Sequence, residues 1–61
     1  KRSIYVSKDI KAGEVFTESN LRIIRPGDGL SPLYWDEILG RKAKQDYKAG
    51  KPLTKEDFFG H

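Results

Sequence analysis

The chain has 61 residues and no cysteine, so it forms one domain at most and has neither a disulfide nor a thiolate metal site to stabilise it. Its 12 Lys and Arg residues are interleaved with 9 Asp and Glu residues, for a net charge of +3, whereas a nucleic-acid-binding surface calls for a basic stripe. No apolar run approaches the length of a membrane-spanning helix, and there is no signal-peptide pattern.

The two ends of the chain carry little functional information. The first residue, Lys1, is not Met, so we expect the sequence to be a piece of a longer protein. The single histidine, His61, has no second histidine with which to complete a metal site, and whether it is native is left open. The missing cysteines fit a reducing cytoplasm without requiring one.

The first predicted element is a strand over residues 3–9, SIYVSKD, in which Ile4 and Val6 fall on one face. It leads into DIKAGEVFTESNL, which begins at Asp9 and returns as DYKAGKPLTKEDF at Asp46, an offset of 37 residues. A pattern repeated at a fixed offset indicates one supersecondary unit used twice. We therefore expect a pseudo-twofold domain in which neither half buries its apolar face alone.

Each copy of the repeat has the same local interpretation. The glycine of Lys-Ala-Gly, Gly13 or Gly50, predicts a turn with positive φ. Thr17 and Thr54 stand at N-cap positions, and the side chain of the third residue after each can accept a hydrogen bond from the backbone of the cap. An apolar residue follows directly and is expected to enter the core. The capping partners are Asn20 and Asp57, and the apolar residues are Leu21 and Phe58.

Residues 21–26, LRIIRP, predict a second strand that Pro26 terminates, because proline has no backbone donor. The residues that follow, Gly27, Asp28 and Gly29, predict a rigid, exposed turn in which glycine accepts positive φ. Arg25 stands at the rim of this turn. From residue type alone, the simplest interpretation of Arg25 is a solvated charge at the end of a strand.

Residues 31–40, SPLYWDEILG, predict a helix with Ser31 as N-cap, Pro32 at the first helical position and Gly40 just past the end. The apolar residues at helical spacing are Trp35, Ile38 and Leu39. We assign the tryptophan to the core rather than to a stacking platform for a ligand.

Residues 41–47, RKAKQDY, predict a return strand towards the second copy of the repeat. Because most elements are short, the predicted fold is mostly β with short 3₁₀ and α turns around a small core. The predicted core consists of Ile4, Val6, Ile10, Val15, Phe16, Leu21, Ile23, Trp35, Ile38, Leu39, Ala43, Leu53 and Phe58.

No catalytic set is visible in the sequence. The serines have no histidine base within the folded region, and Asp36 and Glu37 are adjacent on a helix and do not face each other. The glycines of RPGDG lack the Lys-Ser/Thr pair of a phosphate-binding loop. We predict no catalytic residue, metal site or cofactor site in this chain.

Nearly the whole chain resembles the C-terminal antifreeze-like (SAF) domain of bacterial sialic acid synthases, which make N-acetylneuraminic, legionaminic and pseudaminic acids. The resemblance rests on DIKAGE, TESNL, IRPGDGL, EILGRKA and KAGKPL. It implies a compact β-clip fold, shared with type III antifreeze proteins, which agrees with the pseudo-twofold repeat. It also implies that residues 1–61 are a single domain excised from the C-terminus of a longer, cytoplasmic synthase.

In that family a (β/α)₈ barrel holds a divalent metal, Mn or Mg. The barrel condenses phosphoenolpyruvate with an N-acetylated hexosamine, such as N-acetylmannosamine, to give a nine-carbon 2-keto sugar acid. The resemblance therefore implies that the isolated domain is inactive, binds no cofactor and is a monomer. Which amino sugar is used stays open.

The resemblance also implies a domain-swapped homodimer in which this domain covers the barrel of the adjacent subunit. An Arg of the R-P-G motif contacts the amino sugar there, near its N-acetyl group, and the matching residue here is Arg25. The planar fork of a guanidinium suits a carbonyl or carboxylate better than an ammonium does. Residues 26–29 are expected to shape the loop, and neither nucleic acid nor membrane is an expected partner.

Two alternatives come from other functional classes. One is a free-standing carbohydrate- or nucleic-acid-binding SAF module, which the segments RPGDGLSP and EILGRKA disfavour. The other is an ice-binding protein, which needs a surface free of strongly hydrated charges. The first repeat region instead carries Lys8, Asp9, Lys11, Glu14 and Glu18.

Overall fold

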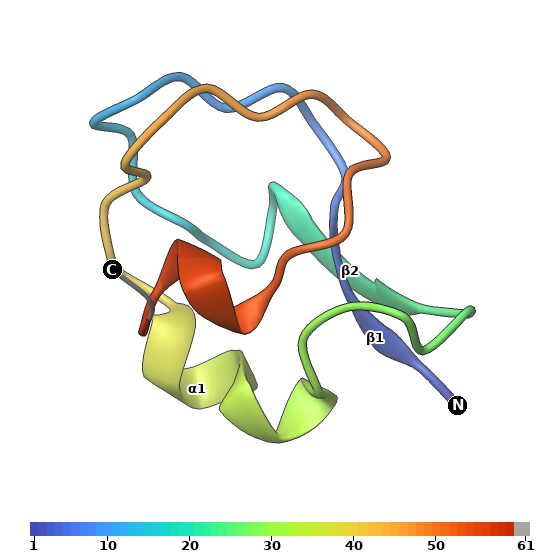
Figure 1. Cartoon of the computed structure of the whole chain (residues 1–61). Helices are drawn as coiled ribbons and strands as arrows, with labels where there is room; N and C mark the ends of the chain where they lie inside the picture. Colours follow the sequence, from blue (N-terminus) through green and yellow to red (C-terminus); the bar gives the residue numbers. More distant parts are fainter. Residues whose placement is uncertain (60–61) are drawn as a thin grey trace.

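The computed structural model describes residues 1–59, in which a few short elements are joined by extended segments (Figure 1). The elements are β1 (Ser3–Val6), β2 (Leu21–Ile24), the 3₁₀ helix η1 (Pro32–Tyr34), α1 (Trp35–Ile38) and the 3₁₀ helix η2 (Lys55–Asp57). The predicted class, mostly β with short 3₁₀ and α turns, is confirmed. His61 lies outside the described residues. Within residues 1–59, no helix has the length and apolarity needed to cross a membrane.

β1 lies between two extended neighbours. On one edge it pairs antiparallel with β2, with Val6 opposite Leu21. On the other edge the Val6 N–H donates to the carbonyl of Lys51 at 2.9 Å. All four residues of β1 are buried. Both predicted strands form, but they are shorter than predicted: the first ends at Val6 and the second at Ile24, before Pro26.

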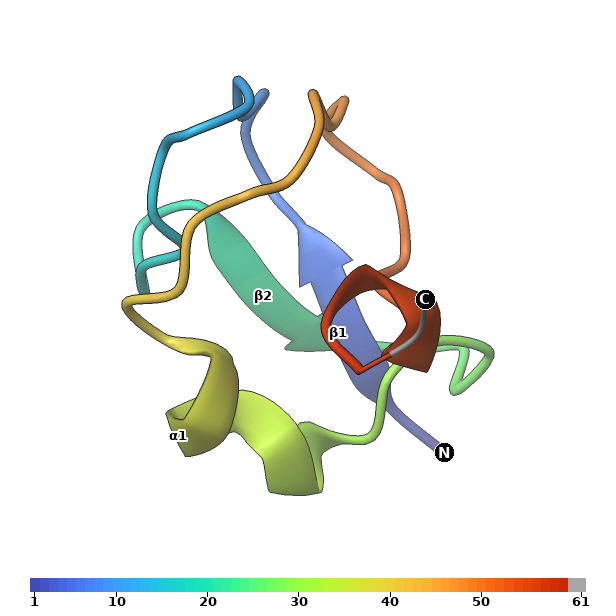
Figure 2. The ribbon, with the colours of Figure 1, turned by 60° about the vertical axis from the view of Figure 1, so that its left-hand side comes forward.

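The two copies of the repeat pair with each other at equivalent positions. Ile10 and Tyr47, which occupy the same place in the two copies, exchange backbone hydrogen bonds of 2.8 and 2.7 Å. The Gly13 N–H donates to Ala43 at 2.8 Å, and its counterpart in the second copy, the Gly50 N–H, donates to β1 at 2.7 Å. Figure 2 shows the turns of both copies at the top of the view. The predicted pseudo-twofold arrangement is confirmed.

Each copy also caps the turn of the other copy with a carboxylate. The Asp9 carboxylate accepts the N–H of Ala49 at 2.8 Å, and the Asp46 carboxylate accepts the N–H of Ala12 at 2.8 Å. Each turn glycine has positive φ, as predicted. The turns are therefore held by residues from the opposite half of the chain.

The predicted capping residues behave alike in the two copies. The Asn20 side chain accepts the Thr17 N–H at 2.8 Å, and the Asp57 carboxylate accepts the Thr54 N–H at 2.8 Å. Only the second copy continues into a 3₁₀ helix, η2. The predicted helix over 31–40 is divided into η1 and α1, and Ser31 accepts the Leu33 N–H as its N-cap.

The core is small, and part of its predicted membership is wrong. Val15 is 41% exposed because its neighbour Phe16 takes the inward side of the extended chain. Three further predicted residues, Ile23, Trp35 and Leu39, are only partly buried against the core. The buried apolar residues are Ile4, Tyr5, Val6, Ile10, Phe16, Leu21, Leu30, Ile38, Ala43, Tyr47, Leu53 and Phe58.

The predicted strand over residues 41–47 is also wrong. This segment makes isolated bridges, Lys42 with Val15 and Tyr47 with Ile10. Both bridges lie in one antiparallel register with residues 10–15, but that facing segment turns at residues 12–13 and the chain bends at residues 44–45, so no continuous ladder forms.

Tyr47 joins the core to the second capping turn. It is 2% exposed, and its hydroxyl donates to the Asp57 carboxylate at 2.8 Å. Burial of the phenol, together with the adjacent carboxylate, raises the pKa of Tyr47 to about 12.

Replacing Leu53, which is fully buried, with alanine should lower the free energy of unfolding by about 2–5 kcal/mol. Leu33, which is 92% exposed, provides a matched control whose replacement should change stability little. Thermal unfolding of the 61-residue chain, followed by circular dichroism, compares the two variants. Equal losses for Leu53→Ala and Leu33→Ala would contradict the observed core.

The raised pKa of Tyr47 predicts a loss of stability at alkaline pH. The stabilisation is complete below the unfolded pKa of about 10 and is lost as the pH rises towards 12, because the unfolded chain ionises first. The loss should be on the order of 2 kcal/mol. Denaturant unfolding between pH 8 and 12 measures it, and Tyr47→Phe should flatten the slope over this interval. A slope unchanged in Tyr47→Phe would assign it to other groups.

Candidate functional site

The candidate site is the loop of residues 25–29, which follows β2 directly (Figure 1, beside the N-terminus). Arg25 is exposed at the first position after the strand. The ion pairs formed within residues 1–59 are Arg41–Glu37 at 3.6 Å and Lys48–Asp9 at 3.9 Å, so no carboxylate in this range neutralises Arg25. Its guanidinium is therefore available to a group outside this part of the chain.

Two side chains of β1 hold the residue after Arg25. The Pro26 carbonyl accepts the Ser3 hydroxyl at 2.8 Å and the Tyr5 hydroxyl at 3.2 Å. Ser3 is 0% exposed. No local sequence pattern points to these two residues, because each lies more than 20 positions from Pro26. The Arg25–Pro26 peptide bond is cis.

The two glycines of the loop are needed for space. A Cβ on Gly27 would lie 2.5 Å from the Cβ of Lys1, and a Cβ on Gly29 would lie 2.6 Å from the Leu53 carbonyl oxygen. Neither glycine has positive φ, so the expected use of positive φ in this turn is wrong. The loop is packed directly against the N-terminal segment and the second repeat.

Leu30 anchors the end of the loop and was missing from the predicted core. It is 2% exposed, its N–H donates to the Leu53 carbonyl at 2.7 Å, and its carbonyl accepts the Ile4 N–H at 2.9 Å. One sequence signal could have identified it. An apolar residue just before an N-cap, here Ser31, occupies the first position of a hydrophobic staple.

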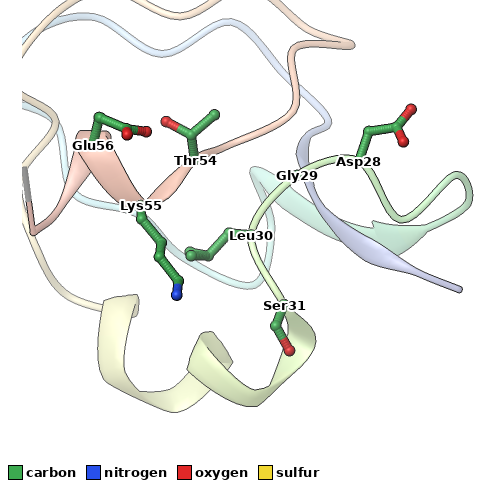
Figure 3. A pocket seen from close by; sticks show the side chains of 7 residues that line it. All are labelled: Asp28, Gly29, Leu30, Ser31, Thr54, Lys55 and Glu56. Atoms are coloured by element: carbon green, nitrogen blue, oxygen red, sulfur yellow. The ribbon is translucent and has the colours of Figure 1, made fainter.

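A pocket of about 420 Å³ opens between the loop and η2 (Figure 3). Leu30 lies at its centre, and the Asp28 side chain extends away from Leu30. The lining residues are Asp28, Gly29, Leu30, Ser31, Thr54, Lys55 and Glu56. The lining thus combines two carboxylates, one ammonium and two hydroxyls with a single apolar side chain.

In the described part of the chain, no three His, Cys, Asp or Glu side chains gather where they could hold a metal ion. The residues near Arg25 offer hydrogen-bond donors and acceptors but no imidazole or thiol. The roles proposed for Arg25 and for residues 26–29 stay predictions.

Comparison with known proteins gives a consistent picture. Residues 1–58 match the SAF domain. The chain is 51% identical over 57 residues to a pseudaminic acid synthase of Campylobacter jejuni, a match that covers 93% of this chain and 17% of that protein. It is 44% identical over 48 residues to an N,N'-diacetyllegionaminic acid synthase of the same organism, covering 79% and 14%.

A solved structure shares the fold. The spore coat polysaccharide biosynthesis protein SpsE of Bacillus subtilis superposes with a TM-score of 0.84 at 31% identity, over 95% of this chain and 17% of that one. The chain therefore spans about a sixth of the length of the proteins that it matches.

The tight packing of the loop predicts that Gly29→Ala is destabilising. The added Cβ meets a backbone carbonyl that cannot rotate away, so the loop or the second repeat must shift, at a cost of about 1–3 kcal/mol. Asp28→Ala, at the adjacent exposed position, is the control and should stay within about 0.5 kcal/mol of wild type. Denaturant unfolding measures both. Equal stability of the two variants would show that the loop is not packed in this way.

Proposed function

The chain belongs to the SAF domain family, and on this basis we propose that it is the C-terminal domain of a longer sialic-acid-type synthase. The proposed reaction condenses phosphoenolpyruvate with an N-acetylated hexosamine to form a 2-keto sugar acid and release phosphate. A barrel elsewhere in the longer protein carries out this reaction with a divalent metal. The similarity to pseudaminic and legionaminic acid synthases supports the assignment, as does the fraction of their length that the chain spans.

The domain itself is proposed to complete the sugar site of the adjacent subunit in a homodimer. The observation that carries this proposal is Arg25, an exposed guanidinium without a carboxylate partner in residues 1–59, on a loop held by β1 and the second repeat. Such an arrangement presents a fixed charge outward. A planar guanidinium can donate to the carbonyl oxygen of an N-acetyl group, which supports the amino sugar as its target.

An ice-binding function receives no support from the surface of the first repeat. Four charged residues of this repeat and the lysine just before it are all exposed, where they retain hydration water. These residues are Lys8, Asp9, Lys11, Glu14 and Glu18.

Arg25→Ala in the full-length synthase should reduce kcat/KM for the amino sugar by roughly 10- to 150-fold, because a charge-assisted hydrogen bond is lost. The KM for phosphoenolpyruvate should change less, since the contact is with the other substrate. Arg25→Lys should recover only part of the activity. Arg22→Ala removes a nearby exposed arginine of β2 and should leave the kinetics unchanged. Wild-type kinetics for Arg25→Ala would contradict the proposal.

The same variant tests whether Arg25 acts across the dimer. Mixing Arg25→Ala with a variant whose barrel is inactive creates heterodimers in which one active site combines an intact barrel with an intact Arg25. Activity should therefore reappear in the mixture. If no activity reappears, Arg25 acts on the active site of its own subunit or on no active site.

A further inference from the structure

We propose that Ser3 and Tyr5 are positioning residues for Arg25, acting through the carbonyl group of Pro26. This inference rests on the proposed function, because it assigns two side chains that direct Arg25 towards the amino sugar. Neither side chain would touch the substrate itself. Both are part of β1, which is buried along its whole length, whereas Arg25 is exposed.

The hydrogen bonds converge on one atom. The Ser3 hydroxyl donates to the Pro26 carbonyl oxygen at 2.8 Å and the Tyr5 hydroxyl donates to the same oxygen at 3.2 Å. Residues 3 and 5 point to the same face of a strand, so β1 presents the two donors side by side. A carbonyl oxygen has two lone pairs, and these two donors occupy both of them.

Burial makes these bonds hard to exchange for water. Ser3 is 0% exposed and Tyr5 is 9% exposed. A buried hydroxyl without a partner is costly, and Pro26 supplies the one acceptor that the Ser3 hydroxyl contacts among residues 1–59. The position of the Pro26 carbonyl is therefore coupled to a strand that is buried along its whole length.

The constraint passes from Pro26 to Arg25 through the covalent chain. Between the Pro26 carbonyl group and the Arg25 Cα, the peptide bond is planar and the proline ring restricts φ, so the ψ angle of Pro26 is the one soft torsion. Fixing the carbonyl therefore confines the Arg25 Cα to the positions that this single torsion allows. The side chain then leaves the loop from a restricted range of positions.

The loop glycines support the same geometry from the other side. A Cβ on Gly29 would lie 3.4 Å from the Ser3 hydroxyl oxygen, so the backbone of residue 29 covers this hydroxyl. Gly27 lies against the backbone of Lys1 and Arg2. The loop is thus in contact with β1 and the N-terminal segment both before and after Asp28.

The test uses full-length synthase carrying Tyr5→Phe, Ser3→Ala or Arg25→Ala, and each of the first two combined with the third. Tyr5→Phe keeps the buried ring and removes only the hydroxyl, so it tests the proposal even if Ser3→Ala fails to fold. Tyr34→Phe and Ser7→Ala are matched controls outside the loop. Each variant is characterised by KM and kcat for both substrates and by its thermal midpoint.

Loss of one neutral hydrogen bond should reduce kcat/KM for the amino sugar by roughly 2- to 10-fold, with the KM for phosphoenolpyruvate unchanged. In the Arg25→Ala background, Tyr5→Phe and Ser3→Ala should have no further effect, because the residue that they position is gone. The two control variants should match wild type.

Three results would overturn the inference, and they separate it from the proposed function. If Arg25→Ala impairs the enzyme while Tyr5→Phe and Ser3→Ala have wild-type kinetics, the positioning role is wrong and the proposed function stands. If the losses persist undiminished in the Arg25→Ala background, the two hydroxyls support the domain in general rather than Arg25. If Arg25→Ala itself is silent, the proposed function fails, and the positioning role fails with it.

Discussion

The reciprocal pairing of Ile10 with Tyr47 is the constraint on which the rest of the structure depends. These buried residues occupy equivalent places in the two copies of the repeat and exchange both backbone hydrogen bonds. Their pairing places each turn within reach of the carboxylate of the other copy, Asp9 or Asp46. A chain this short buries only about 60% of its unfolded surface, so interlocking two incomplete halves is an effective way to form one core.

The symmetry is interrupted at the candidate site. Phe16 and Leu53 are equivalent in the repeat, and the Phe16 carbonyl accepts the N–H of Gly40 at 2.8 Å. The Leu53 carbonyl instead accepts the N–H of Leu30, at the end of the loop. At the carbonyl of Leu53, the end of the loop thus takes the place that Gly40 takes at the equivalent carbonyl of Phe16. The asymmetric part of the domain is also the part that presents Arg25.

The contacts that stabilise the loop also hold the backbone that carries Arg25. β1 is buried on both faces because β2, the second repeat and the loop all pack against it. An arginine carried by a loop that is fixed to such a strand loses only side-chain freedom when it meets a ligand, which reduces the entropic cost of binding. The mixed polar lining of the pocket beside the loop extends the same surface towards η2.

Local features of this protein could be predicted from its sequence, whereas contacts between distant residues could not. The repeat, the turn glycines, the Ser31 cap and the presence of both strands follow from the preferences of a few neighbouring residues, and Arg25 stood out through its motif. The sequence did not reveal that Val15 faces outward, that Leu30 and Tyr47 are buried, or that residues 41–47 form isolated bridges rather than a strand. Nor did it reveal the hydroxyls that hold Pro26 or the exchanged carboxylate caps, whose partners are 21 to 40 positions apart. Only the tertiary structure decided these, because no local preference specifies which distant segment comes to lie beside a given residue.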